Sequence, residues 1–256
     1  LGELKRGARG VPLEALDRAR WSARAKKLGA RERRWARACG FDASPGTFCL
    51  LPDARGNHAR ALAGVDAGLP AFALGALPSL LPRGDYVFTQ ASGDAVVAPA
   101  DAALGWALGA YRFTRYLAAP ADPPRLLVPR AVLDEVGPVL DAICTLRDRI
   151  NTPSEQMGPR ELCEAVRELA AAHRAKYRDW QGDALLQAGF PTVHAVGRAS
   201  THAPRVAELR WGKPSDPLLA IVGKGVCFDS GGLDIKPADG MRWMKKDMGG
   251  AAHAIA

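Results

Sequence analysis

Short apolar segments bounded by Pro, Gly and Asp recur along the chain and predict β-strands. Each segment is only a few residues long, too short for a typical helix. The predicted strands lie at residues 47–51, 61–65, 86–90, 95–98, 126–128, 193–196, 206–211 and 218–222.

Longer segments with apolar residues three and four positions apart predict helices between these strands. The segment 159–176 is the clearest, because Pro159 stands at an early position and Leu162, Val166 and Leu169 share one face. Further helices are predicted at 17–39 (one helix, or two broken at Gly29), at 102–116 and at 131–150. The residues 251–256 are predicted to open another helix.

Alternation of strands and helices predicts an α/β protein, with a parallel or mixed sheet covered by helices. A proline-rich stretch at 118–124 is the predicted linker. We therefore expect a smaller N-terminal α/β domain at 1–124. A second α/β domain at 125–256 is expected to hold a mixed, largely parallel sheet.

Composition narrows the class of protein. The chain has 256 residues, of which 48% are hydrophobic, and this is sufficient for packed cores. No uninterrupted apolar stretch approaches the roughly 18–20 residues that span a bilayer, and the first residues lack the apolar region of a signal peptide. Five cysteines are scattered singly, which is typical of reduced thiols. We expect a cytoplasmic protein without membrane contact.

Positive charge is concentrated in residues 1–40, which we call the basic arm. Twelve Lys or Arg residues stand there against four acids, a net charge of +8 that equals the net charge of the whole chain. Such an arm could contact nucleic acid. A solvated helix face is the simpler interpretation, and no zinc-finger or RNP-type motif supports nucleic-acid binding.

Four of the charged residues in 218–252 indicate a polar site. Lys224 stands between two glycines after an apolar run, and Asp229, Lys236 and Asp247 follow. The glycines suggest a phosphate-binding loop, but Lys224 is not followed by the Ser or Thr that such a loop needs. The dinucleotide fingerprint fails as well, because Phe228 replaces its third glycine.

A metal site fits these residues better. Asp229 and Asp247 offer hard oxygen ligands, and a lysine can act as a ligand if its surroundings favour the neutral amine. A second, protonated lysine would stabilise an oxyanion. The alternative is a group of solvated loop charges, in which lysines pair with acids of the same loop: Lys236, Lys245 and Lys246 with Asp234 and Asp239.

Residues 224–252 carry three motifs in one order and spacing: K-G-x-x-F-D-S-G-G, then I-K-P, then M-K-x-D-M-G-G-A-A. In this the chain resembles the leucine aminopeptidase family, also called cytosol aminopeptidases. The resemblance extends upstream through RDRINTP at 147–153, AVGRAS at 195–200 and RVAELRW at 205–211. It covers about residues 104–256, and residues 125–256 would then be the first part of a catalytic domain.

The resemblance implies roles for five residues. Lys224 and Asp247 would bind the more loosely held of two metal ions, and Asp229 would bridge both. Lys236 would polarise the peptide carbonyl and stabilise the gem-diolate. Met244 would line the pocket for the first side chain of the substrate, although core packing explains a methionine equally well.

The resemblance also implies two divalent metal ions per subunit, Mn²⁺ or Zn²⁺ with Mg²⁺ as a further candidate. Bicarbonate, peptide substrates and a homo-hexamer are implied as well. The family's later segment NTDAEGRL, with further ligands and an arginine, is absent from the sequence. We expect a fragment of a longer metallo-exopeptidase that removes N-terminal amino acids, and no catalysis if the chain ends at residue 256. The alternative is a non-catalytic protein that binds nucleic acid.

Overall fold

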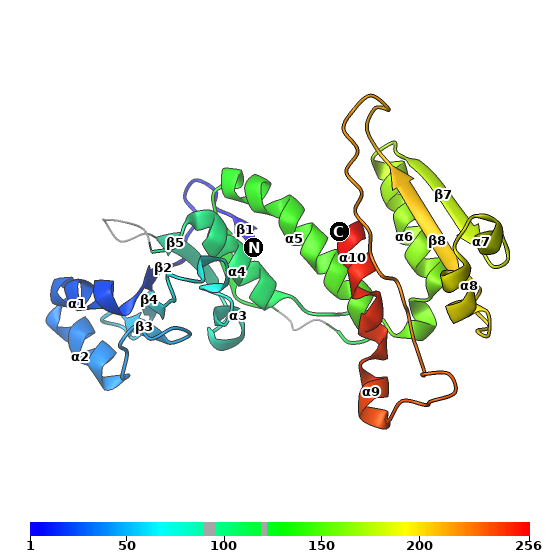
Figure 1. Cartoon of the computed structure of the whole chain (residues 1–256). Helices are drawn as coiled ribbons and strands as arrows, with labels where there is room; N and C mark the ends of the chain where they lie inside the picture. The colour runs from blue at the N-terminus through cyan, green and yellow to red at the C-terminus, as the bar shows by residue number, and fades with distance from the viewer. Residues whose placement is uncertain (90–95, 119–121) are drawn as a thin grey trace. The chain divides into compact units, whose positions relative to one another are not determined.

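The computed structural model describes residues 1–89, 96–118 and 122–256, which form two compact units, Leu1–Asp141 and Ala142–Ala256 (Figure 1). The division falls inside the long helix α5, Arg130–Asn151. The predicted linker at 118–124 lies partly outside the described residues, and the predicted domain boundary at 124/125 stays a prediction.

The first unit contains a six-stranded sheet in the order β1-β6-β5-β2-β4-β3. All neighbouring strands are parallel except β3 and β4, which are antiparallel. The α/β class is thus confirmed. The mixed, mostly parallel sheet lies in this first unit, whereas the described part of the second unit holds an antiparallel pair of strands, 176–181 and 205–210, in place of the largely parallel sheet expected there. The strands of the six-stranded sheet are β1 Gly2–Glu3, β2 Val11–Leu16, β3 Phe48–Pro52, β4 His58–Gly64, β5 Asp85–Thr89 and β6 Arg125–Val128.

Helices cover both faces of this sheet. Successive side chains of a strand point to opposite faces, and in β4 Ala61 and Ala63 join one buried cluster while Leu62 joins the other. The first cluster includes Trp106 of α4, and the second includes Ala36 of α2. These helices are α1 Arg18–Lys27, α2 Ala30–Ala38, the 3-10 turn η1 Pro70–Phe72, α3 Leu77–Leu80 and α4 Pro99–Ala110.

The predicted break at Gly29 is confirmed, because α1 ends before it and α2 begins after it. The Gly29 N–H donates to the Glu32 carboxylate at 3.0 Å, which caps α2. Part of the charge of the basic arm is held in ion pairs, Arg18 with Asp42 and Arg24 with Glu14. Nucleic-acid binding through the arm stays a prediction.

The central strand β2 was missed from the sequence. Pro12 and Glu14 interrupt its apolar pattern, and both residue types are uncommon inside a sheet. Glu14 is buried there because Arg24 Nε donates to its carboxylate at 2.6 Å and Arg60 lies 3.6 Å away. Those partners come from distant parts of the chain, so the local pattern contains no sign of them.

In the second unit, helix α6 packs on an antiparallel pair of strands, β7 and β8 (Figure 1). The elements are η2 Ser154–Gln156, α6 Pro159–Ala172, β7 Lys176–Gln181, α7 Ala184–Gln187, α8 Pro191–Gly197, β8 Arg205–Arg210, α9 Ala238–Arg242, η3 Met244–Met248 and α10 Gly249–Ile255. The predicted helix at 251–256 and the predicted strand at 206–211 are confirmed as α10 and β8. Among the helices of the described chain, none has the length and apolar character needed to cross a bilayer.

One predicted assignment is of the wrong type, and two predicted helices are formed but end earlier than predicted. Residues 193–196 belong to helix α8, where Pro191 occupies the first turn and favours a helix start. The predicted helix 159–176 ends at Ala172, because Arg174 adopts a left-handed φ of 53°, and Lys176 begins β7. In the first unit the predicted helix 102–116 ends at Ala110, where α4 stops.

Two predicted strands are not formed. Residues 96–98 lie in bends and loop before α4, and residue 95 lies outside the described residues. Residues 218–222 are neither helix nor strand, and Leu218 and Val222 are 93% and 92% exposed. The apolar run has the composition of a buried strand, but no strand in the described chain pairs with it.

Candidate functional site

The predicted site residues come from two adjacent segments of the second unit. Lys224, Asp229 and Lys236 lie on the irregular segment 211–237, drawn in orange in Figure 1, and Met244 and Asp247 lie on η3. Helix α10 follows η3 directly.

A glycine allows the segment of Lys224 to approach α10. A Cβ atom on Gly223 would lie 2.4 Å from the carbonyl oxygen of Gly250 and 2.5 Å from Cα of Ala251, so no other residue fits without a shift. The Ala251 N–H donates to the Lys224 carbonyl at 2.9 Å. This bond satisfies one of the free N–H groups at the start of α10 and fixes Lys224 beside η3.

Lys236 and Asp229 form the tightest contact of the site, with Nζ 2.6 Å from Oδ2. The other oxygen, Oδ1, accepts the Gly231 N–H at 2.9 Å, and the Lys236 N–H donates to the Ser230 carbonyl at 3.0 Å. The hydrogen bond from Lys236 is the largest cause that lowers the pKa of Asp229, followed by the Gly231 N–H, and the charge of Lys224 adds to it. Asp229 is therefore held as a carboxylate.

Asp247 is held by lysines on both sides. Lys246 Nζ lies 3.3 Å from Oδ1, and Lys224 Nζ lies 3.5 Å from Oδ2 and 3.2 Å from the Asp247 carbonyl oxygen. The hydrogen bond from Lys246 is the largest cause that lowers the pKa of Asp247, and the charge of Lys224 lowers it further. Lys224 thus pairs with Asp247, and its charge also acts, more weakly, on Asp229.

Met244 is buried, 8% exposed, and its Sδ atom lies 3.3 Å from Nζ of Lys236. The ammonium group of Lys236 thus contacts both Asp229 and Met244. Whether Met244 lines a substrate pocket stays a prediction.

The alternative of loop pairing is met in part, because Lys236 and Lys246 pair with acids close in sequence, Asp229 and Asp247. Asp239 pairs with Arg242 at 3.2 Å, not with a lysine. Lys245 donates to the Asn151 carbonyl at 3.1 Å and so ties η3 to the end of α5. Sequence reasoning missed this anchor and the Lys246–Asp247 pair, although Lys246 is the immediate neighbour of Asp247 in the chain.

The donor set fits a divalent cation in part. Asp229 and Asp247 offer the hard carboxylate oxygens that Mn²⁺ and Mg²⁺ take, and Lys224 Nζ lies 3.5 Å from the Asp247 carboxylate. Within residues 1–89, 96–118 and 122–256, however, no three His, Cys, Asp or Glu side chains gather at one point that could hold a metal.

Two family models match the chain. The model of the M17 aminopeptidase N-terminal domain matches residues 11–129, and the model of the cytosol aminopeptidase family catalytic domain matches residues 144–256. The chain belongs to the cytosol aminopeptidase family. The predicted site residues all lie in the part that matches the catalytic domain.

Individual cytosol aminopeptidases support this assignment. A probable cytosol aminopeptidase of Micrococcus luteus is 35% identical over 214 residues, which is 80% of this chain and 40% of that protein. The one from Rhodococcus opacus is 35% identical over 173 residues, 60% of this chain and 34% of that protein. The chain therefore spans less than half the length of these relatives.

Solved structures of the family have the same fold. The cytosol aminopeptidase from Coxiella burnetii matches with a TM-score of 0.88 and 37% identity, over 98% of this chain and 55% of that one. The bottromycin maturation enzyme BotP in complex with Mn matches with a TM-score of 0.74 and 29% identity, over 96% of this chain and 54% of that one.

Proposed function

We propose that this chain supplies the metal-binding and lysine-bearing part of an exopeptidase that removes N-terminal amino acids from peptides in the cytoplasm. Membership of the cytosol aminopeptidase family supports this proposal. The observation that carries it is the 2.6 Å contact between Lys236 and Asp229 beside Lys224, because it places an ammonium group next to potential metal ligands.

Lys224, Asp229 and Asp247 are the residues that would hold two divalent metal ions, together with further ligands. Mn²⁺ is the first candidate, because BotP, a similar protein, has been solved with Mn, and Zn²⁺ and Mg²⁺ are alternatives. When bound, such ions supply Lewis-acid activation of water and of the peptide carbonyl. Bicarbonate as an additional group and assembly into a homo-hexamer belong to the same proposal.

Lys236 is suited to stabilise an oxyanion. An ammonium group has three protons to donate. One is directed to Asp229 Oδ2 at 2.6 Å and a second to Met244 Sδ at 3.3 Å, which leaves one for a carbonyl oxygen of the substrate. The two protein contacts fix the direction of the third donor, and a pre-oriented donor is what stabilises developing negative charge.

Substitution of Lys236 tests this role. We expect Lys236→Ala to lower kcat for hydrolysis of an aminoacyl-anilide by roughly 10²–10³-fold, the loss typical of one oxyanion donor. The measurement uses the full-length protein with Mn²⁺. Lys213→Ala is the matched control, because Lys213 is an exposed lysine away from the site, and it should leave kcat unchanged. An unchanged kcat in Lys236→Ala would refute the role of Lys236.

A further inference from the structure

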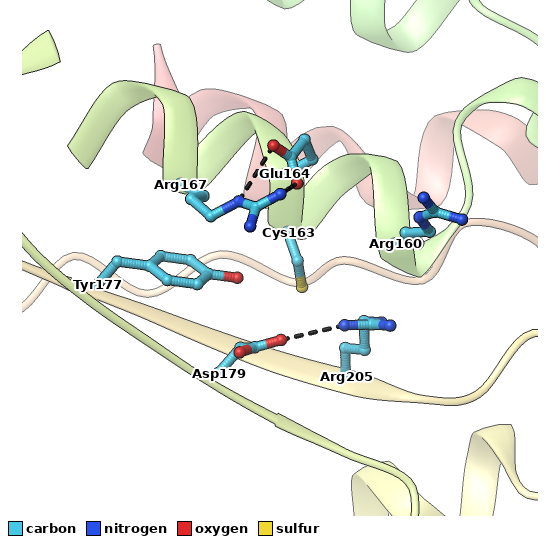
Figure 2. Close-up of a pocket in the computed structure, with 7 residues that line it drawn as sticks. All are labelled: Arg160, Cys163, Glu164, Arg167, Tyr177, Asp179 and Arg205. Atoms are coloured by element: carbon cyan, nitrogen blue, oxygen red, sulfur yellow. Dashed lines mark hydrogen bonds and ion pairs between the residues drawn. The ribbon is translucent and has the colours of Figure 1, made fainter. Parts of the chain in front are cut away.

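A second polar site lies in the second unit, in a cavity of about 220 Å³ between α6 and the β7–β8 pair (Figure 2). It contains none of the predicted metal or catalytic residues. From α6 it is lined by Arg160, Cys163, Glu164 and Arg167, whose spacing of three, four and seven places them on one face of the helix. This face turns toward the strands.

The strands supply the opposite wall. Tyr177 and Asp179 are two residues apart on β7 and therefore point to the same face, and Arg205 begins β8. Figure 2 shows the Tyr177 hydroxyl and the Cys163 thiol directed into the space between helix and strands. The space is open to solvent on one side, because Arg160, Arg167 and Asp179 are exposed, whereas Cys163 is buried.

The charges in this cavity do not balance. Glu164 pairs with Arg167, and Asp179 pairs with Arg205 at 3.0 Å. Arg160 has no hydrogen-bond or ion-pair partner within the part of the chain that the structure describes. One guanidinium is therefore left over, and its planar set of donors suits an oxyanion.

Neutral donors complete the lining. Burial raises the pKa of the Cys163 thiol to about 11 and that of the Tyr177 hydroxyl to about 12. Both groups keep their protons at neutral pH and add no negative charge that would repel an anion.

We propose that this cavity binds a compact oxyanion, either inorganic phosphate or a small carboxylate, with Arg160 as the main anchor and the Tyr177 hydroxyl as a donor. Arg167 pairs with Glu164 on the helix wall, and Arg205 pairs with Asp179 on the strand wall. These two pairs leave a single positive charge in excess in the cavity. A compact anion is favoured over a long one because the cavity is small.

Titration calorimetry of the metal-free, full-length protein tests the proposal, since removal of metal excludes anion binding to metal ions. Inorganic phosphate and acetate are titrated separately against chloride at equal ionic strength. We expect saturable binding of phosphate or acetate, and the stronger of the two identifies the ligand class. Binding of neither would overturn the proposal.

Two variants locate the binding. Arg160→Gln should weaken it about tenfold, the lower end expected for loss of a charged hydrogen bond. Arg198→Gln removes an exposed arginine outside the cavity and should bind as the wild type does. Equal affinities in the wild type and Arg160→Gln, or equal losses in both variants, would contradict the assignment. Tyr177→Phe removes only the hydroxyl and should weaken the affinity. An unchanged circular dichroism spectrum of this variant would show that binding is lost and folding is not.

Discussion

Single residues of the site are controlled by their charged neighbours. Asp229 and Asp247 are both flanked by lysines, and both have a lowered pKa. A carboxyl group whose pKa is lower in the folded than in the unfolded protein stabilises the fold above its unfolded pKa of about 3.9. That stabilisation is lost as the pH falls through the lower, folded pKa. The two pairs therefore stay intact at neutral pH and weaken only in acid.

Removal of the Lys236 charge should shift the pKa of Asp229. Because the hydrogen bond from Lys236 is the largest cause of the lowered pKa, we expect Lys236→Met to raise the pKa of Asp229 toward its ordinary value. A ¹³C NMR titration of the aspartate carboxyls measures this shift. Lys213→Met serves as the control and should leave Asp229 unchanged. A pKa of Asp229 that does not move in Lys236→Met would show that the contact is absent in solution.

The sequence identifies these residues but not all of their neighbours. Lys224, Asp229, Lys236 and Asp247 could be predicted, because the motifs that contain them are local and specific. The anchor from Lys245 to the Asn151 carbonyl could not, because a bond between residues 94 positions apart depends on the fold.

At the scale of elements, a strand predicted from a local pattern forms only where a neighbouring strand is available to pair with it. The apolar patterns of β4, β5 and β6 predict these strands correctly, because their apolar residues are buried in the first unit. Residues 218–222 are apolar as well, but no strand in the described chain pairs with them, so they form neither helix nor strand and stay exposed. Helix α8 was mistaken for a strand because its two valines favour a strand, whereas Pro191 and the helical hydrogen bonds determine the outcome.

The contact between residue 223 and α10 gives a prediction at this scale. Gly223→Ala should destabilise the second unit by about 1–3 kcal/mol, because the new methyl group would overlap the backbone of Gly250 and Ala251. Urea denaturation measures the change. Gly240→Ala is the matched control, since Gly240 lies in α9 with no atom closer than 3.7 Å to the added methyl, and alanine favours a helix. Equal stability of the wild type and Gly223→Ala would contradict the close approach.

For the whole molecule, the family assignment and the α/β class could be read from the sequence, whereas the assembly could not. The chain covers 55% of the length of the Coxiella burnetii enzyme. Sequence motifs single out the segment proposed to bind metal. A hexamer or a nucleic-acid complex depends on surfaces whose partners lie outside any local pattern. Both remain predictions.

The central claim is that Lys224, Asp229 and Asp247 bind metal ions, and Mn²⁺ titration followed by electron paramagnetic resonance of the free ion tests it most directly. In the full-length protein we expect two classes of Mn²⁺ site. Asp229→Asn should weaken both and Asp247→Asn only the weaker one. Asp239→Asn, which alters an exposed acid paired with Arg242, should bind as the wild type does. Unchanged Mn²⁺ binding in Asp229→Asn would contradict the account.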